Sequence, residues 1–163
     1  MKRASRYYFL LVPVVLVAGV LAAGVWFVNH RAPVMVSDDI RENLARGGRI
    51  AVAVQELSNA SNPLFEYEYV VIDRGRGGAE AAVREQISRM RESGWELESA
   101  TSGRWHLRSD KYQTVADVQF LSAFIQEWGN GDNIYPEERA ASKIAATVGD
   151  VSSLIIVTLR HFG

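Results

Sequence analysis

Apolar and polar residues alternate most regularly in residues 64–73, LFEYEYVVID. One side of this alternation is apolar throughout and holds Phe65, Tyr67, Tyr69 and Val71. The other side begins with two glutamates and becomes apolar only at its end. A period of two residues is typical of a β-strand, and this mixed second face predicts an antiparallel sheet with one partly solvated face.

The pattern changes to a helical one in residues 78–95, GAEAAVREQISRMRESGW. Its apolar positions recur at spacings of four, four and three residues, at Ala79, Val83, Ile87 and Met90. Gly94 is placed to end the helix in the left-handed conformation. Trp95 is then expected to fold back onto Met90, the contact that accompanies a Schellman motif.

The rest of the chain after residue 95 predicts three strands, a short helix, a longer helix and a final strand. The first two strands fall at 95–100 and 104–109, and the third runs from 112 to about Phe120, with the short helix after it. Pro136 and two following glutamates favour a helix from 136 to 147. Residues 152–162 are rich in β-branched residues, and their near-continuous apolar run predicts a central strand.

The segment before residue 63 is less regular. Residues 37–48, SDDIRENLARGG, predict a helix with Ser37 as its cap and a Gly-Gly end. Residues 49–57, RIAVAVQEL, fit either period, because Ile50, Val54 and Leu57 suit a helix while alternate positions suit a strand. We favour a second helical piece there.

From residue 63 onward the order is therefore strand, helix, three strands, helix, strand (β-α-β-β-β-α-β). This order predicts an α+β fold, a single-sheet α/β sandwich whose helices lie mainly on one face. An N-terminal transmembrane helix is expected to precede this sandwich. There is no internal repeat and no low-complexity segment.

Residues 7–28, YYFLLVPVVLVAGVLAAGVWFV, form an uncharged run of 22 residues. A helix of this length spans about 33 Å, enough for a hydrocarbon core of about 30 Å, so we expect it to cross the lipid bilayer. A cleaved signal peptide is the alternative, with 20–22 as the cleavage site. The apolar run continues well beyond that site, which favours an uncleaved anchor.

Basic residues set the expected orientation of this anchor. Lys2, Arg3 and Arg6 precede it, whereas the basic residues after it are spread out and interleaved with acids. By the positive-inside rule the N-terminus is cytoplasmic. We therefore expect a single-pass cell-membrane protein with a cytoplasmic basic N-terminus (1–6), a transmembrane helix (7–28), a juxtamembrane linker and helical segment (29–62) and an extracytoplasmic α+β domain (63–163).

Composition narrows the functional classes. Of 163 residues, 48% are hydrophobic and none is cysteine, which excludes disulfides, thiol catalysis and Cys-based zinc sites. Beyond residue 28 the chain holds 15 basic and 19 acidic residues, a net charge of −4. A mildly acidic domain does not suit nucleic acid, which rewards a basic face. We expect no nucleic-acid partner.

The glycine-rich loop DRGRGGAE, between the clearest strand and the clearest helix, is the candidate ligand site. It lacks the Lys-Ser/Thr pair of a P-loop and the G-x-G-x-x-G spacing of a dinucleotide site. A helix N-terminus can nevertheless attract an anion. An anion site formed by Arg74, Arg76, Gly77 and Gly78 is one interpretation, and a turn whose glycines allow unusual φ/ψ is the favoured one.

Other candidate chemistry is weaker. The three histidines have no metal-ligand spacing, so no metal or other cofactor is expected. No G-x-S-x-G elbow is present. Four glutamates, at 66, 68, 96 and 98, would share a face if their strands were neighbours, and could then bind calcium or act as an acid/base pair. A solvated face is the favoured interpretation, and no residue is assigned a catalytic role.

The combination of YEYVVID, an amphipathic helix and SGWELES resembles small uncharacterised bacterial domains, which often follow a single membrane anchor in actinomycete-like proteins. The resemblance covers roughly residues 65–99 and implies no activity. The sequence thus favours a membrane-anchored binding or interaction domain, an accessory or assembly component of the cell envelope, with a protein partner or self-association. An envelope hydrolase or a small-anion sensor is the alternative.

Overall fold

The computed structural model describes residues 38–58, 66–75 and 77–162. The chain divides into two units, Met1–Ala32 and Pro33–Gly163, and all described residues belong to the second. The expected transmembrane helix at 7–28 therefore lies outside the described residues. Within the described ranges, no helix is long and apolar enough to cross a membrane.

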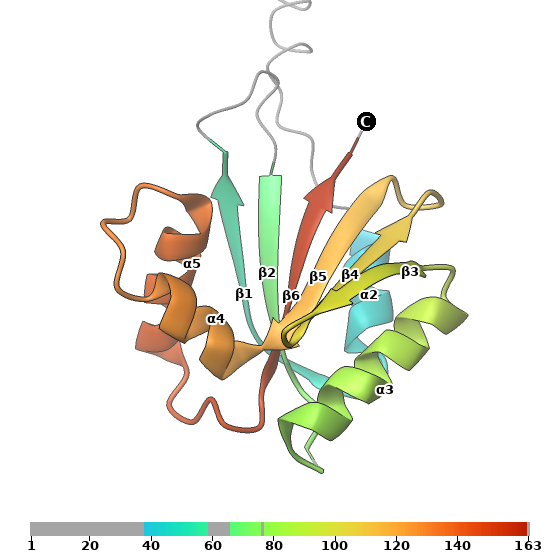
Figure 1. Cartoon of the computed structure of the whole chain (residues 1–163), viewed down its shortest axis with the longest axis horizontal. Helices are drawn as coiled ribbons and strands as arrows, with labels where there is room; N and C mark the ends of the chain where they lie inside the picture. The colour runs from blue at the N-terminus through green and yellow to red at the C-terminus, as the bar shows by residue number, and fades with distance from the viewer. Residues whose placement is uncertain (1–37, 59–65, 76, 163) are drawn as a thin grey trace, which may run out of the picture. The chain divides into compact units, whose positions relative to one another are not determined.

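The described residues of the second unit form a single antiparallel sheet of six strands (Figure 1). Its spatial order is β1-β2-β6-β5-β4-β3, so β1 and β3 form the two edges. The strands are β1 (Arg49–Leu57), β2 (Glu66–Asp73), β3 (Glu96–Thr101), β4 (Arg104–Ser109), β5 (Thr114–Phe120) and β6 (Ile155–His161). The expected α+β class and the central position of the last strand are confirmed.

Among the described residues, four helices accompany the sheet: α2 (Asp38–Ala45), α3 (Gly78–Glu92), α4 (Leu121–Trp128) and α5 (Pro136–Thr147). The buried residues of α2 and α3 pack on one face of the sheet, and those of α4 and α5 pack on the other. The expectation that the helices lie mainly on one face is therefore wrong. The central strands explain why, because Val70 and Ile72 of β2 face α2 and α3 while Tyr69 and Val71 face α4 and α5.

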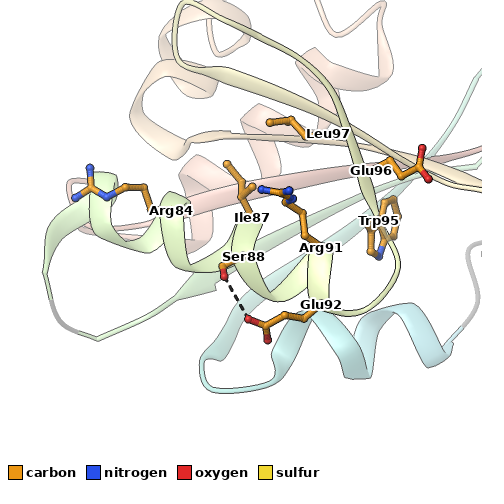
Figure 2. Close-up of a pocket in the computed structure, with 8 residues that line it drawn as sticks. All are labelled: Arg84, Ile87, Ser88, Arg91, Glu92, Trp95, Glu96 and Leu97. Carbon is orange, nitrogen blue, oxygen red and sulfur yellow. Dashed lines mark hydrogen bonds between the residues drawn. The ribbon is translucent and has the colours of Figure 1, made fainter.

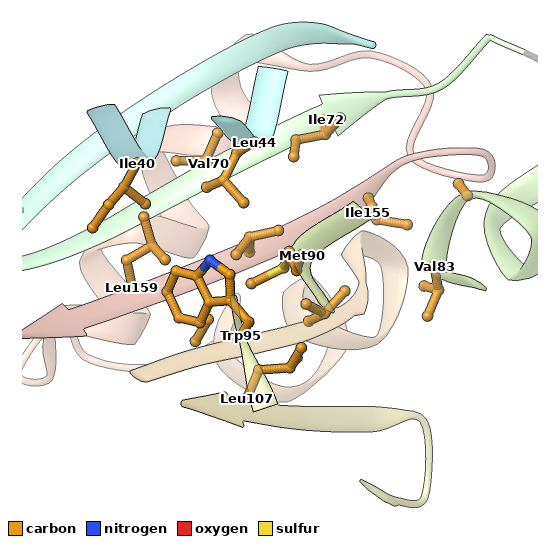
Figure 3. Packing of buried hydrophobic residues seen from close by; sticks show 14 residues of the cluster. Ile40, Leu44, Val70, Ile72, Val83, Met90, Trp95, Leu107, Ile155 and Leu159 are labelled. Atoms are coloured by element: carbon orange, nitrogen blue, oxygen red, sulfur yellow. The ribbon is translucent and has the colours of Figure 1, made fainter. Parts of the chain in front are cut away.

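The larger core lies between the sheet and the helices α2 and α3 (Figure 3). Ile40 and Leu44 of α2 meet Val70 and Ile72 of β2 there, and Met90 and Trp95 fill the space towards β4. Burying one such aliphatic or aromatic side chain stabilises the folded state by roughly 1.5–3 kcal/mol. This core fixes α3, and through it the candidate site described below.

Strand β1 corrects a second expectation, since residues 49–57 are extended and not helical. They pair antiparallel with β2 from Arg49 to Leu57, with a bulge between Ile50 and Val52. Both periods fit the sequence, and the backbone partner offered by β2 favours the strand because it satisfies the amide groups of β1 along one side. The sheet thus includes residues that precede position 63.

The expected helix and turn around residues 78–95 are confirmed. Helix α3 ends at Glu92, and Gly94, just beyond it, has a φ of +92°. The Trp95 amide donates to the Met90 carbonyl at 3.0 Å, and the Gly94 amide donates to the Arg91 carbonyl at 3.1 Å. These two bonds make up the Schellman motif. Helix α4 begins directly after Phe120 and α5 begins at Pro136, also as expected.

Candidate functional site

An open groove runs between helix α3 and the edge strand β3 (Figure 2). Its volume is about 870 Å³. Six lining residues come from the helix and the turn that follows it, and two come from the start of β3: Arg84, Ile87, Ser88, Arg91, Glu92, Trp95, Glu96 and Leu97. The site is therefore built by two elements adjacent in sequence.

The turn at Gly94 holds these two elements apart at a fixed distance. Trp95, directly after it, is 3% exposed and packs against Tyr112 in a tilted arrangement with ring centroids 5.9 Å apart. The buried Ser109 of β4 donates its hydroxyl to the Gly94 carbonyl at 3.2 Å. The turn is thus tied to the core on one side and to β4 on the other, so the groove is preformed.

Apolar and cationic side chains share the helix side of the groove. Figure 2 shows Ile87 and Arg91 on the side of α3 that faces Leu97, while Glu92 points away from it. Leu97 is 41% exposed and adds apolar surface to the groove. Within the described ranges Arg91 makes no ion pair. Arg84 makes one with Glu80, with 3.6 Å between the guanidinium nitrogen and the carboxylate oxygen, and the side chains of Arg84 and Glu80 are largely exposed.

Strand β3 forms the other wall and is open along its outer edge. All six of its residues are exposed, and among the described strands it pairs with β4 alone. The pairing is interrupted by a bulge between Leu97 and Ser99. An edge strand offers a row of unpaired amides and carbonyls to an incoming chain. The groove therefore combines free backbone groups with a pocket for side chains.

A separate polar cluster lies on the α4/α5 side of the sheet, on strands those helices do not cover. His106 of β4 bonds to Asp117 of β5, with 2.8 Å between Nδ1 and the carboxylate oxygen. On its other side, Nε2 of His106 lies 3.4 Å from Glu98. The imidazole is thus held between two carboxylates and joins three neighbouring strands, so it links them.

The structure places the residues of the expected anion site in different surroundings. The Arg74 side chain is buried and donates to the carbonyls of Arg46, at 2.6 Å, and Leu44, as well as to Gln86. Burial lowers the pKa of the Arg74 guanidinium below its ordinary value. Arg74 thus caps the C-terminal end of α2.

The other three members lie at or before the start of α3. Gly77 and Gly78 adopt φ angles of +93° and +72°, and no side chain caps the helix at Gly77. Arg76 lies outside the described residues. The glycines thus provide the left-handed turn between strand and helix, and anion binding at this turn remains a prediction.

The four glutamates do not meet on one face. Strands β2 and β3 are separated by β6, β5 and β4. Glu66 and Glu68 are buried, and Glu68 accepts a bond from Arg41 of α2. Burial raises the pKa of Glu68, and Arg41 opposes that effect only in part. Among the described residues no group of three or more His, Asp or Glu could hold a metal ion.

A smaller hollow of about 520 Å³ lies at the end of β1, lined by Gln55, Glu56, Leu57, Asn133 and Arg139. Glu56 accepts bonds from Arg139 at 2.7 Å and from Lys143 at 2.6 Å, both on α5. Burial alone would raise the pKa of Glu56, but these two cations outweigh it and lower the pKa. The cluster fastens α5 to the edge strand.

Reasoning from the sequence did not identify the groove. It assigned Ile87 to the buried stripe of α3, whereas Ile87 is half-buried and lines the groove. The one available signal was Leu97, a leucine flanked by Glu96 and Glu98 on a strand. A single exposed leucine on a strand is common, so this signal alone does not locate a binding surface.

Comparison with known proteins adds no relative. No protein-family model matches the chain, and neither the curated proteins nor the solved structures contain a match.

Proposed function

We propose that this protein is a membrane-anchored interaction module that binds an extended peptide segment of a partner protein in the groove between α3 and β3. The observation that carries this proposal is the juxtaposition of an open edge strand with a helix across a preformed hollow of about 870 Å³. Adding a strand to such an edge is a recurring mode of peptide recognition: backbone bonds supply affinity, and pockets for alternate side chains supply specificity.

The lining suggests the chemistry of the peptide. Side chains that point towards α3 would meet Ile87 and Leu97, and at the rim Arg84 and Arg91. Side chains that point the other way would lie beside Glu96. Charge complementarity therefore favours an apolar anchor flanked by acidic residues on the helix side, alternating with neutral or basic residues on the opposite side.

An enzymatic role has less support. An active site is expected to gather groups with perturbed pKa values in one concave pocket. The described residues with shifted pKa values are Arg41, Glu56, Glu68, Tyr69, Arg74 and Asp150, and none of them lines the groove. Apart from Tyr69 and Asp150, these groups belong to ion pairs or helix caps that hold the fold together.

The membrane location is part of the proposal and rests on the uncharged run at 7–28 with its preceding basic residues. Protease added to intact spheroplasts should digest the chain beyond residue 28. Full protection of the chain, with digestion only after lysis, would place the domain on the cytoplasmic side instead.

Peptide binding can be tested with a displayed library of random dodecapeptides, selected on the full-length protein in lipid nanodiscs. We expect the selected sequences to alternate as described above. Their affinity, measured by fluorescence polarisation, should fall at least tenfold in Leu97→Arg, which fills the groove, because charge and bulk would replace the apolar contact.

The matched control is Ala53→Arg, an equivalent change at an exposed position of the other edge. It should leave peptide affinity unchanged. Binding that survives Leu97→Arg, or that depends on Ala53, would show that the groove is not the site.

A further inference from the structure

Strand β1 forms the opposite edge of the sheet, and its middle lacks the residues that usually keep an edge strand from pairing with another chain. It extends over nine residues, Arg49–Leu57, and its outer side pairs with no other described strand. Residues 50–55, IAVAVQ, contain neither a charge nor a proline, the residues that usually keep an edge from pairing with another chain. Ala51, Ala53 and Leu57 are exposed along it. Such an edge is suited to backbone pairing.

The charges of β1 are confined to its two ends and have opposite signs. Arg49 lies at the start, where its side chain is 78% exposed, and Glu56 lies near the end. An antiparallel copy of the same strand would place the basic end of one chain beside the acidic end of the other. Glu56 is already bonded to Arg139 and Lys143, so the self-complementarity of the strand lies in its uncharged middle, where the order Val52-Ala53-Val54 is the same in both directions.

Because of the bulge in β1, the residues that would pair between the two copies lie on the same face of the sheet. In the pairing with β2, Ala51 is the residue left without an opposite partner. With Ala53 on a two-fold axis and Ala51 again left out, Val52 lies opposite Val54 of the second copy. The next pairs are then Ile50 with Gln55 and Arg49 with Glu56.

The two residues of each pair lie on the same face of the sheet. Val52, Val54 and Glu56 lie on the α4/α5 side, because they are opposite Val71, Tyr69 and Tyr67 of β2. Arg49 lies on the same side as its β2 neighbour Asp73, to which it is bonded at 3.2 Å. A register shifted by one residue would break all of these matches, since it moves every side chain to the other face.

A contact at the end of β1 limits the pairing between the two copies to residues before Leu57. Arg139 donates to the Leu57 carbonyl at 2.9 Å, so this acceptor is already used within the chain. The ladder between the two copies would thus run from Arg49 to Glu56 and stop there.

We propose that two copies of this chain associate through their β1 strands, antiparallel and centred on Ala53, to form one continuous twelve-stranded sheet. Backbone hydrogen bonds along the two strands and two contacts between Val52 and Val54 hold the interface. Opposed β-branched pairs are among the cross-strand pairs that stabilise sheets. This inference does not depend on peptide binding by the groove.

The association closes at two copies. Pairing about a two-fold axis uses the same edge of both chains, so no β1 edge is left. The outer edges of the joined sheet are then the two β3 strands, which carry Glu96 and Glu98 and a bulge. The negative charge of these strands opposes the addition of a third copy.

The absence of cysteine from the chain makes a direct test possible. Ala53→Cys in the full-length protein, in native membranes, should be joined rapidly by a short bismaleimide to a product of twice the chain mass. Directly opposite positions bring Cβ atoms to about 5 Å. Ala100→Cys, at an exposed position of β3, is the matched control and should react at least ten times more slowly. Equal rates, or a product containing another protein, would overturn the proposal.

A second variant tests the same interface without a cross-linker. Ala53→Asp places two carboxylates together on the axis and should raise the dimer dissociation constant at least tenfold, measured by mass photometry in detergent. Circular dichroism should remain unchanged because the position is exposed. Ala100→Asp should leave the dimer intact. A dimer that survives Ala53→Asp, or a wild-type protein that is monomeric at every concentration, would contradict the pairing.

Discussion

The two edges of this sheet are protected in different ways. Strand β3 is short, bulged and acidic, and it lies beside a helix across an open groove. Strand β1 is longer, its middle is uncharged, and its end is fastened to α5 through Glu56. An acidic edge repels its own copies but can accept a strand of different composition, whereas an edge whose middle is uncharged and reads the same in both directions fits a copy of itself.

This difference indicates how one small sheet can separate assembly from recognition. If β1 is used between two copies, both β3 grooves remain accessible at the far edges. Two identical grooves would then bind a partner with repeated segments more strongly than one groove, because the second binding event becomes intramolecular. The following changes test whether the two edges are independent.

The largest expected effect is on the β3 side. Trp95→Ala should lower the free energy of unfolding by about 3–5 kcal/mol, because it empties a buried aromatic site. Leu97→Ala, two residues away and 41% exposed, should cost less than about 1 kcal/mol. Denaturant unfolding measures both. Similar losses for the two variants would contradict the assignment of Trp95 to the core and Leu97 to the groove.

A smaller effect is expected on the β1 side. Glu56→Gln should lower the free energy of unfolding at pH 7 by about 1–3 kcal/mol, since it removes charge-assisted hydrogen bonds from Arg139 and Lys143. Peptide affinity at the groove should not change. A loss of peptide binding in this variant would show that the two edges are coupled.

The same residue gives the stability a pH dependence. The pKa of Glu56 in the folded state lies below its ordinary value of 4.5, so the unfolded chain holds this proton more tightly. The stabilisation is therefore complete above about pH 4.5 and is lost as the pH falls through the folded-state pKa. Glu56→Gln should reduce this acid loss of stability. Glu68→Gln is the contrasting variant, because the raised pKa of Glu68 acts with the opposite sign.

The smallest effect concerns the turn that positions β3. Gly94→Ala should cost about 1 kcal/mol, because φ is +92° there although no atom lies within 4 Å of an added Cβ. Gly149→Ala meets the same open space without a positive φ, and should change the stability by less than about 0.5 kcal/mol. A thermal unfolding series distinguishes the two. Equal effects would show that the left-handed conformation at Gly94 is not required.

Local patterns in the sequence predicted the elements that depend on local interactions. The strand at 66–73, the helix at 78–92 and its glycine end all follow from periodicity and capping. Strand β1 could not be predicted in this way, because residues 50–57 fit both periods and the choice depends on pairing with β2. Such a pairing is set by the sheet as a whole and not by the segment itself.

The presence of helices on both faces of the sheet can be predicted from the central strands. Val70, Val71 and Ile72 are consecutive and buried, as are Ile155 and Ile156. Runs of this kind show that a strand is covered on both faces. The groove was harder to predict, since it depends on how far α3 lies from β3. That distance is set by Trp95 and its contacts, which no periodicity shows.

The most direct test of the difference between the two edges is hydrogen exchange of the full-length protein in nanodiscs, measured by mass spectrometry at several protein concentrations. Amides of residues 49–56 should become more protected as the concentration rises. Amides of residues 96–101 should be unaffected by concentration and become protected only when a selected peptide is added. Equal protection of both strands with rising concentration, or no change in β1 at any concentration, would contradict the account.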